Sequence, residues 1–198
     1  MPLLEDEAPP DPYQLFSKWY GEALEAGTPQ PDAMTLATVG EEGPSARMVL
    51  YKGLQKGSFI FYSNYDSRKG RDLSHDRRAA LVFYWPATRH QVRVYGVVHK
   101  IKREASAEYF ATRPRGAQLS AAASPQSRVV PSRFFLERRV REQASMHPDT
   151  VPLPRAWGGY ALRPSWIEFW ENREDRLHDR LRYTVKDRGG WRMERLAP

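Results

Sequence analysis

The chain has 198 residues, of which 40% are hydrophobic and 12% aromatic, enough for one domain with a substantial core. It has no cysteine, which excludes disulfides, thiolate metal sites and a cysteine nucleophile. The net charge of +7 suits an anionic partner, but the sequence shows no nucleic-acid-binding signature and no apolar run long enough to cross a bilayer. We therefore expect a soluble, cytoplasmic protein that binds a small anion rather than nucleic acid or a membrane.

The first third of the chain predicts a tail, a helix and a strand meander. Residues 1–10 are rich in proline and acid, so we expect a disordered N-terminal tail. Asp11-Pro12 is typical of a helix start, and the apolar spacing that follows ends at Gly27. A second, short helix is expected over 67–74. Strands joined by turns are expected over 34–39, 46–50 and 58–63.

The remaining sequence predicts more strands around a helical insertion. Helices are expected over 104–112 and 132–144, whereas residues 116–131 lack periodicity and are expected to form a structured loop. Further strands are expected over 79–85, 91–101, 158–162, 166–170, 181–185 and 191–196. About seven or eight antiparallel strands with few helices favour a closed or split barrel, because closure removes exposed sheet edges.

A dense polar segment near the C-terminus is the first candidate for chemistry. Arg176, His178 and Arg180 fall at alternate positions, so in an extended chain their side chains would leave one face. Cations gathered in this way repel one another unless an anionic or electron-rich group lies between them. A solvated hairpin edge, with Asp175 and Asp179 as counter-charges, is the alternative, and spacing alone leaves both interpretations open.

Other residue pairs could also bind anions. They are Arg47 with Lys52 on one strand, Arg68 with Lys69 at a strand-to-helix junction, and Tyr109 with Arg113 one helical turn apart. The junction also offers free backbone N–H groups, which suit a phosphate. The sequence has no Gly-x-Ser-x-Gly elbow, Walker loop, Gly-x-Gly-x-x-Gly motif or metal-ligand spacing. We therefore expect no metal, and any nucleotide cofactor must bind without a Rossmann fold.

A series of short motifs, in a fixed order, carries a resemblance to a known family. The motifs are Arg47-Met-Val-Leu-Tyr-Lys52, Phe61-Tyr-Ser-Asn-Tyr-Asp-Ser-Arg-Lys-Gly70, Phe83-Tyr-Trp-Pro86, Gln91-Val-Arg-Val94, Tyr109-Phe, Arg113-Pro-Arg115, Ser124-Pro-Gln-Ser127, Trp157-Gly-Gly-Tyr160, Ile167-Glu-Phe-Trp170 and Arg176-Leu-His-Asp-Arg180. Together they closely resemble the pyridoxamine/pyridoxine 5′-phosphate oxidase family, from about residue 11 to the C-terminus. The resemblance implies a mostly β fold with peripheral helices (α+β). The implied architecture is an antiparallel FMN-binding split β-barrel, expected to form a homodimer with FMN at the subunit interface. Residues 11–198 would be a single domain that includes the C-terminal hairpin used for dimerisation and the active site.

The resemblance also implies the site residues. FMN is expected to contact Arg47, Met48, Val49, Leu50, Tyr51, Lys52, Tyr62, Ser63, Arg68, Lys69, Gln91, Gln126, Ser127, Trp170 and Arg180. The substrate is expected to contact Lys52, Tyr109, Arg113, Arg176, Leu177 and His178. Within these sets, Arg68 and Lys69 would hold the flavin phosphate, and Arg176 and His178 would be the catalytic residues.

The implied activity is oxidation of pyridoxamine or pyridoxine 5′-phosphate to pyridoxal 5′-phosphate, a reaction of vitamin B6 metabolism. Hydride would leave the C4′ carbon for flavin N5, and O₂ would then be reduced to hydrogen peroxide, with ammonia released from the amine substrate. The flavin would carry the redox chemistry, while the protein would orient the two reactants and provide the electrostatic environment around them. Two alternatives stay open: a related split-barrel oxidase that acts on another ring, as in phenazine biosynthesis, and a non-catalytic protein that binds FMN or pyridoxal phosphate.

The chain departs from the family pattern around its expected substrate site. The family usually has serine where Ala117 stands and tryptophan where Ala122 stands. The basic N-terminal arm that can cover the substrate is also missing from this sequence. These departures concern the binding of the substrate rather than the fold or the flavin.

Ala117→Ser should therefore tighten binding of the phosphorylated substrate. A hydrogen bond to a charged group contributes about 1.5–3 kcal/mol, so the dissociation constant should fall by roughly ten-fold or more. Titration of the protein with pyridoxine 5′-phosphate measures this change. An unchanged affinity would mean that another group, such as Ser120 or a bound water, already fills the role of the missing hydroxyl.

Overall fold

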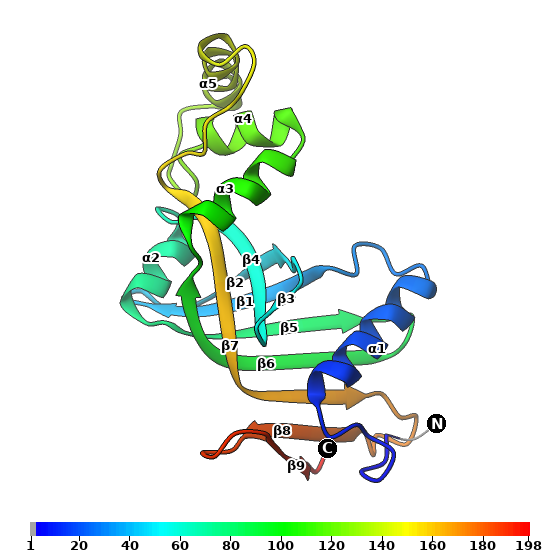
Figure 1. Cartoon of the computed structure of the whole chain (residues 1–198). Helices are drawn as coiled ribbons and strands as arrows, with labels where there is room; N and C mark the ends of the chain where they lie inside the picture. Colours follow the sequence, from blue (N-terminus) through cyan, green and yellow to red (C-terminus); the bar gives the residue numbers. More distant parts are fainter. Residues whose placement is uncertain (1–2) are drawn as a thin grey trace.

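The computed structural model describes residues 3–198, and in that range it contains five helices and one antiparallel sheet of nine strands (Figure 1). The helices are α1 (Pro12–Glu25), α2 (Arg68–His75), α3 (Arg103–Thr112), α4 (Arg115–Ala123) and α5 (Arg133–Met146). The strands are β1 (Ala33–Gly40), β2 (Gly43–Leu50), β3 (Leu54–Gln55), β4 (Ser58–Asn64), β5 (Arg78–Trp85), β6 (His90–Lys100), β7 (Trp157–Glu171), β8 (Asp179–Val185) and β9 (Trp191–Arg195). The sheet runs β2-β1-β5-β6-β7-β4-β3, with β8 beside β7 and β9 beside β8. No helix within residues 3–198 is long and apolar enough to cross a membrane.

Strand β7 connects the two parts of the sheet. From Tyr160 to Glu171 it pairs with β6, but on the other side its first half pairs with β4 and its second half with β8. The change of partner falls at a register shift, where Gly96 faces Pro164 and Tyr95 faces Trp166. A β-bulge there bends the strand, as Figure 1 shows. The expected pair of strands over 158–162 and 166–170 is thus one strand, because the bulge accommodates a proline that cannot donate a ladder hydrogen bond.

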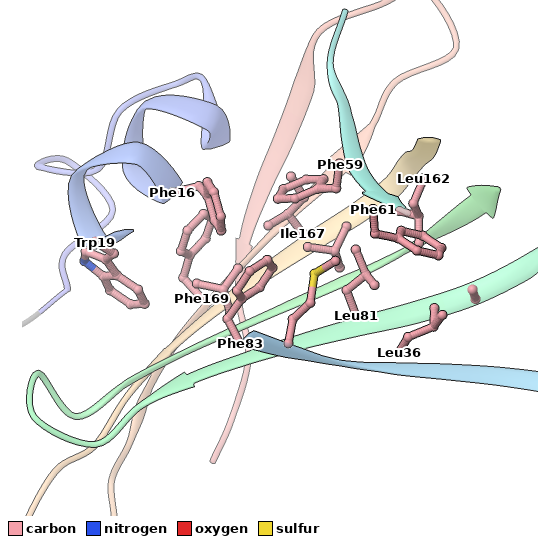
Figure 2. Packing of buried hydrophobic residues seen from close by; sticks show 14 of the residues in the cluster. Phe16, Trp19, Leu36, Phe59, Phe61, Leu81, Phe83, Leu162, Ile167 and Phe169 are labelled. Carbon is pink, nitrogen blue, oxygen red and sulfur yellow. The ribbon is translucent and has the colours of Figure 1, made fainter. Parts of the chain in front are cut away.

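Aromatic side chains fill the space between α1 and the sheet (Figure 2). Phe16 of α1 meets Phe59 and Phe83 edge-on, with ring centroids 4.9 and 5.1 Å apart. Trp19, one turn further along α1, packs edge-on against Phe169 at 5.2 Å. Such pairs add to the stabilisation that burial alone provides. The apolar face predicted for this helix is therefore core packing, which supports the sheet that carries the site.

The sequence predictions differ from the structure in the helical part of the chain and at the β3–β4 hairpin. Residues 116–131 do not form one loop, because α4 covers Arg115–Ala123. Pro114 precedes its first turn, the segment is rich in alanine, Leu119 is buried in the cluster around Phe110, and Ala123 is buried as well. The short strand β3, next to β4, was not expected.

Residues 3–10, which belong to the tail expected to be disordered, form contacts with the rest of the chain. Leu3 is buried, the Tyr183 hydroxyl donates a hydrogen bond to the Pro9 carbonyl at 2.9 Å, and Glu5 forms an ion pair with Arg195. Residues 1 and 2 lie outside the described part of the chain. The composition of a segment indicates how much apolar surface its own residues can bury. It does not indicate contacts with a strand that is distant in the sequence.

Gly96→Ala should destabilise the fold, because a Cβ at this position would overlap the backbone carbonyl of Arg163. Backbone cannot rotate away, so we expect a loss of about 1–3 kcal/mol in the free energy of unfolding, measured by urea denaturation. Gly21→Ala is the matched control, because its Cβ would meet open space on α1. That control should gain about 0.5–1 kcal/mol. A Gly96→Ala protein as stable as the original would contradict close packing at the bulge.

Candidate active site

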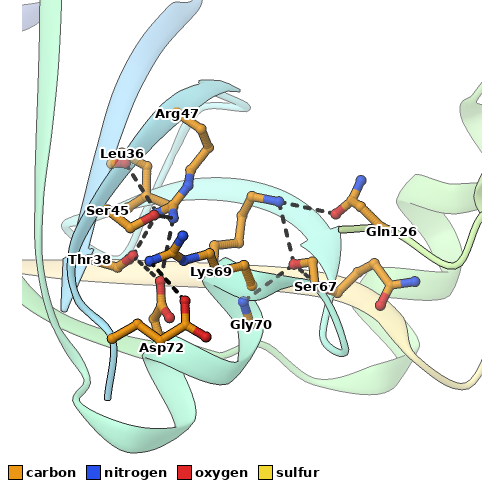
Figure 3. A network of polar contacts seen from close by, with 12 residues as sticks. Leu36, Thr38, Ser45, Arg47, Ser67, Lys69, Gly70, Asp72 and Gln126 are labelled. Atoms are coloured by element: carbon orange, nitrogen blue, oxygen red, sulfur yellow. Dashed lines mark hydrogen bonds and ion pairs between the residues drawn. The ribbon is translucent and has the colours of Figure 1, made fainter. Parts of the chain in front are cut away.

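A polar network lies between β1, β2 and α2 (Figure 3). Asp72 of α2 is buried, and it accepts a hydrogen bond from the Thr38 hydroxyl at 2.7 Å and pairs with Arg47 at 3.4 Å. Arg47 also donates to the hydroxyl oxygens of Thr38 at 2.6 Å and Ser45 at 2.5 Å. Burial lowers the pKa of Arg47, while the Asp72 carboxylate opposes this shift. The guanidinium is therefore charged and fixed in orientation before any ligand arrives.

Lys69 is the second cation of this network. Its Nζ donates to the side-chain oxygen of Gln126 at 3.0 Å and to the Ser67 hydroxyl at 3.4 Å (Figure 3). Ser63 donates to the same Gln126 oxygen at 3.3 Å. Burial, assisted by the nearby charge of Arg47, lowers the pKa of Lys69 to about 8. Within residues 3–198 no carboxylate pairs with this ammonium group, so an anion bound here would stabilise its charged form.

Stacked aromatic rings form a wall beside the cations. Tyr62 of β4 stacks on Tyr109 of α3 at 3.9 Å and on Trp157 of β7 at 5.3 Å. The guanidinium of Arg113 lies over the Trp157 ring, 4.9 Å from its centroid. The Nη1 group of Arg113 is buried and, in the described part of the chain, has no hydrogen-bond partner. A buried unpaired donor is costly, so this group fits an acceptor supplied by a ligand.

These residues border one cleft of about 420 Å³. Its lining includes Met48, Val49, Leu50, Lys52, Tyr62, Ser63, Lys69, Tyr109, Arg113, Gln126 and Trp157. The cleft combines cations, an aromatic wall and the side chains of strand β2, so it suits a flat ring system that carries phosphate. Lys52 is paired with Asp32 at 2.8 Å. The cleft is also lined by Thr112 and Pro114, so ten of its thirteen lining residues were predicted from the sequence as cofactor or substrate contacts, and Thr112, Pro114 and Trp157 were not.

A second cluster lies on three adjacent strands. In the sheet register Trp170 of β7 faces Gln91 of β6 on one side and Arg180 of β8 on the other. Arg180 donates from Nε and Nη2 to the buried carboxylate of Glu168, at 3.0 and 2.8 Å. His178 packs on the Trp170 ring, with centroids 4.7 Å apart. Three predicted flavin contacts and one predicted catalytic residue are thus brought together.

The expectation that Arg176, His178 and Arg180 share one extended face is wrong. Residues 172–178 form a loop, in which Arg176 has a left-handed backbone with φ +66°. The carboxylate of Asp175 accepts a hydrogen bond from the Leu177 backbone N–H at 3.0 Å. This local turn overrides the period-two alternation. Arg176 and Leu177 consequently point into solvent, and only Arg180 belongs to a strand.

The two clusters lie at opposite ends of β7 within one chain. Trp157 begins this strand beside the cleft, whereas the loop that carries Arg176 and His178 follows its last residue, Glu171 (Figure 1). Neither Arg176 nor His178 lines the cleft. The structure therefore does not bring the predicted substrate contacts of a single chain into one place.

The other predicted contacts lie apart from these clusters or at their edges. Tyr51 packs among the core aromatic residues, where burial raises its pKa to about 12. Arg68 pairs with Glu42 at 3.3 Å and borders a separate groove. Ser127 follows Gln126 with φ +67°.

The carboxylates that hold these cations in place were not predicted from the sequence. They are Asp32, Asp72 and Glu168, which pair with Lys52, Arg47 and Arg180. Only Glu168 could have been predicted from the sequence. It interrupts the apolar run Ile167–Trp170, and a buried carboxylate needs a partner. Trp157 was noted as part of a motif but not as a wall of the cleft.

The fold is an antiparallel split barrel with a C-terminal strand pair. Its cleft combines cationic side chains with an aromatic wall, which defines a protein that binds a planar, phosphorylated ligand. The sequence model of pyridoxamine 5′-phosphate oxidase matches residues 20–147, and that of the pyridoxine 5′-phosphate oxidase C-terminal dimerisation region matches residues 157–198. The chain belongs to the pyridoxamine 5′-phosphate oxidase family.

Individual relatives and solved structures agree with this assignment. The pyridoxine/pyridoxamine 5′-phosphate oxidase of Salinibacter ruber is 51% identical, over 99% of this chain and 93% of the relative. That of Burkholderia thailandensis is 50% identical, over 96% and 90%. The structure of PhzG from Burkholderia lata 383 in complex with tetrahydrophenazine-1-carboxylic acid matches with a TM-score of 0.91 at 29% identity, covering 98% of this chain and 95% of that one. An FMN-binding, pyridoxamine 5′-phosphate oxidase-related protein from Nostoc punctiforme matches in fold, with a TM-score of 0.74 at 21% identity and coverage of 91% and 96%. The family and the split-barrel fold predicted from the sequence are confirmed.

Binding of FMN should weaken as the pH rises above about 8. The pKa of Lys69 is lowered to about 8, so above this pH the side chain becomes neutral and attracts the ligand phosphate less. Titrations followed by flavin fluorescence between about pH 7 and 9 should show the affinity falling, by up to about ten-fold per pH unit at the alkaline end.

Lys69→Met should bind FMN more weakly at neutral pH and lose most of this pH dependence. Lys186→Met is the matched control, because Lys186 is exposed in the β8–β9 turn and lies away from the cleft. An affinity that stays constant across this pH range in the original protein would contradict the assignment of Lys69 to the phosphate.

Proposed function

We propose that this chain is an FMN-dependent oxidase that converts pyridoxamine and pyridoxine 5′-phosphate to pyridoxal 5′-phosphate. Oxygen accepts the electrons and becomes hydrogen peroxide, and the amine substrate also releases ammonia. The cleft is the main evidence for this proposal. In it, Lys69 and Arg113, whose Nη1 has no hydrogen-bond partner within residues 3–198, form two separate candidate anion-binding sites beside one aromatic wall. Two phosphorylated molecules, cofactor and substrate, would need two such sites. Relatives that are half identical over almost the whole chain carry this activity in their names.

The residues of the polar network fit the phosphate end of FMN. Arg47 is already oriented by Asp72, while Lys69 lacks a carboxylate partner within residues 3–198, so the pair offers one fixed cation and one available cation. Ser63 and Gln126 add polar groups beside them. When bound, FMN supplies hydride acceptance and reoxidation by oxygen. The protein's part is to hold the cofactor in one position and orientation relative to the substrate.

The substrate phosphate would bind at Lys52, Tyr109 and Arg113. The Arg113 guanidinium is buried over Trp157, and its Nη1 donor gains the acceptor that it lacks once a phosphate is bound. Lys52 would exchange or share its present partner, Asp32. Arg176 and His178 would then contact the ring and its C4′ carbon, since a planar guanidinium can cover a ring and also donate hydrogen bonds.

A second copy of the chain would complete each cleft. The C-terminal part of the chain, residues 157–198, is the dimerisation region of this family, so the protein acts as a homodimer. The loop with Arg176 and His178 follows the end of β7, whereas the cleft of the same chain lies at the start of this strand. In a two-fold dimer each loop can reach the other chain's cleft, which gives two equivalent sites. This arrangement is consistent with FMN at the interface.

The related alternative is an oxidase that acts on another ring, as the similarity to PhzG allows. That similarity is one of fold, at 29% identity, whereas the relatives named as pyridoxine/pyridoxamine 5′-phosphate oxidases are about 50% identical. We therefore favour the vitamin B6 substrates. A cytoplasmic location remains our prediction from the sequence.

Aerobic turnover tests the proposal directly. The FMN-loaded protein should form pyridoxal 5′-phosphate and hydrogen peroxide in equal amounts from pyridoxine 5′-phosphate. Arg176→Ala should lower kcat/KM by about 10²–10³-fold, as expected when one group that stabilises the transition state is removed. Its FMN affinity should be unchanged, because Arg176 is an exposed loop residue and does not line the cleft.

Arg188→Ala, in the exposed β8–β9 turn, is the matched control and should keep full activity. A flavin-loaded protein that oxidises neither the alcohol nor the amine substrate would refute the proposed function while leaving the fold intact.

A further inference from the structure

Asp179 stands where the 172–178 loop joins β8, and both of its carboxylate oxygens are occupied. Oδ2 accepts hydrogen bonds from Arg173 Nε at 2.8 Å and from the Leu3 backbone N–H at 3.3 Å. Oδ1 accepts one from Arg195 Nη1 at 2.8 Å. One side chain therefore ties together the start of the loop, the last strand and the N-terminal segment.

Arg195 carries this connection on to the N-terminal segment. Its Nε and Nη2 donate to the two carboxylate oxygens of Glu5 at 2.6 and 2.8 Å, and Nη2 also donates to the Leu3 carbonyl at 2.6 Å. The two parallel hydrogen bonds form a bidentate pair, the most directional kind of ion pair. The hydrogen bond from Arg195 lowers the pKa of Glu5 to about 2, so this carboxylate is charged at neutral pH.

At the other end of the chain of contacts lies His178. The backbone N–H of Arg173 donates to His178 Nδ1 at 3.0 Å, and the imidazole packs on the ring of Trp170. A neutral imidazole whose Nδ1 accepts a hydrogen bond carries its proton on Nε2. Neutral His178 is therefore a donor through Nε2–H, and cannot accept a proton at that nitrogen.

We propose that Glu5, Asp179, Arg173 and Arg195 are positioning residues that fix the 172–178 loop and hold His178 as its Nε2–H tautomer. This inference rests on the proposed function, because His178 matters as a substrate contact of that site. Under this inference the N-terminal segment contributes to catalysis indirectly, through the 172–178 loop, although none of the segment's residues contacts the substrate.

The loop needs such external contacts. Arg176 has a left-handed backbone, which is unfavourable for a non-glycine residue, and both it and Leu177 are exposed. At its two ends the loop is held by Arg173 and Asp179, and Arg89 adds contacts with the Asn172 backbone at 3.0 Å and with the exposed Glu174 at 3.5 Å. Because Glu5 is exposed, its ion pair adds little to global stability, so its removal should loosen the loop without unfolding the protein.

Nuclear magnetic resonance of the FMN-loaded protein with ¹⁵N-labelled histidine tests the inference. The chain has five histidines, and His178→Asn identifies the signal of His178. In the original protein Nδ1 of neutral His178 should show the shift of an acceptor nitrogen and Nε2 that of a protonated one. Glu5→Ala should give a mixture of the two tautomers and lower kcat by about ten-fold, with unchanged FMN affinity and thermal midpoint.

Glu7→Ala is the matched control, since it removes a charge from the same segment and Glu7 forms no ion pair within the described residues. It should leave both tautomer and kcat unchanged, and Glu5→Gln, which keeps part of the hydrogen bonding, should fall between Glu5→Ala and the original protein. An unaltered His178 spectrum and kcat in Glu5→Ala would overturn the proposal, as would parallel losses of FMN binding and thermal stability, which indicate a structural role. If the original protein makes no pyridoxal 5′-phosphate, the proposed function fails, and the tautomer spectra alone then decide the role of Glu5.

Discussion

The change of partner along β7 is the constraint on which the rest of the structure depends. Its first half is fixed to β4, which brings Trp157 against Tyr62 and sets the aromatic wall of the cleft. Its second half is fixed to β8, which places Arg180 beside Trp170. A hydrogen-bonded strand is stiff, so the two clusters are held apart in one chain. Under the proposed function, a complete site would therefore require a second chain, and dimerisation would be part of the chemistry.

Buried carboxylates decide which cations are available to ligands. Asp72 and Glu168 hold Arg47 and Arg180 in fixed orientations. Buried ion pairs contribute little net stability, because the desolvation of the charges offsets their attraction, so orientation is the better account of these pairs. In contrast, Lys69 and Arg113 have no carboxylate partner in the described part of the chain, and burial lowers the pKa of each. The oriented cations shape the site, and in the proposed function the other two would bind the two phosphates.

The sequence predicted most of the strands, the capped start of α1 and most residues of the cleft, because these depend on local periodicity and on motifs. It missed contacts between residues far apart in the chain: Asp72 holds Arg47 from 25 positions away, and Glu5 reaches Arg195 across almost the whole chain. The loop around Arg176 was misjudged, since a side-chain turn at Asp175 competes with the extended conformation and prevails. Fold similarity alone could not have separated the substrates, because PhzG shares this architecture as well.

In the proposed dimer each active site combines the cleft of one chain with the loop of the other. Coexpression of an Arg113→Ala chain with an Arg176→Ala chain, under separate tags that allow the mixed dimer to be purified, tests it most directly. Each variant alone should be nearly inactive. In the mixed dimer one cleft keeps Arg113 and receives the intact loop of its partner, so about half of the original activity per dimer should return. If each site were built from a single chain, both sites of the mixed dimer would carry a defect, and an inactive mixed dimer that still binds FMN would contradict the account.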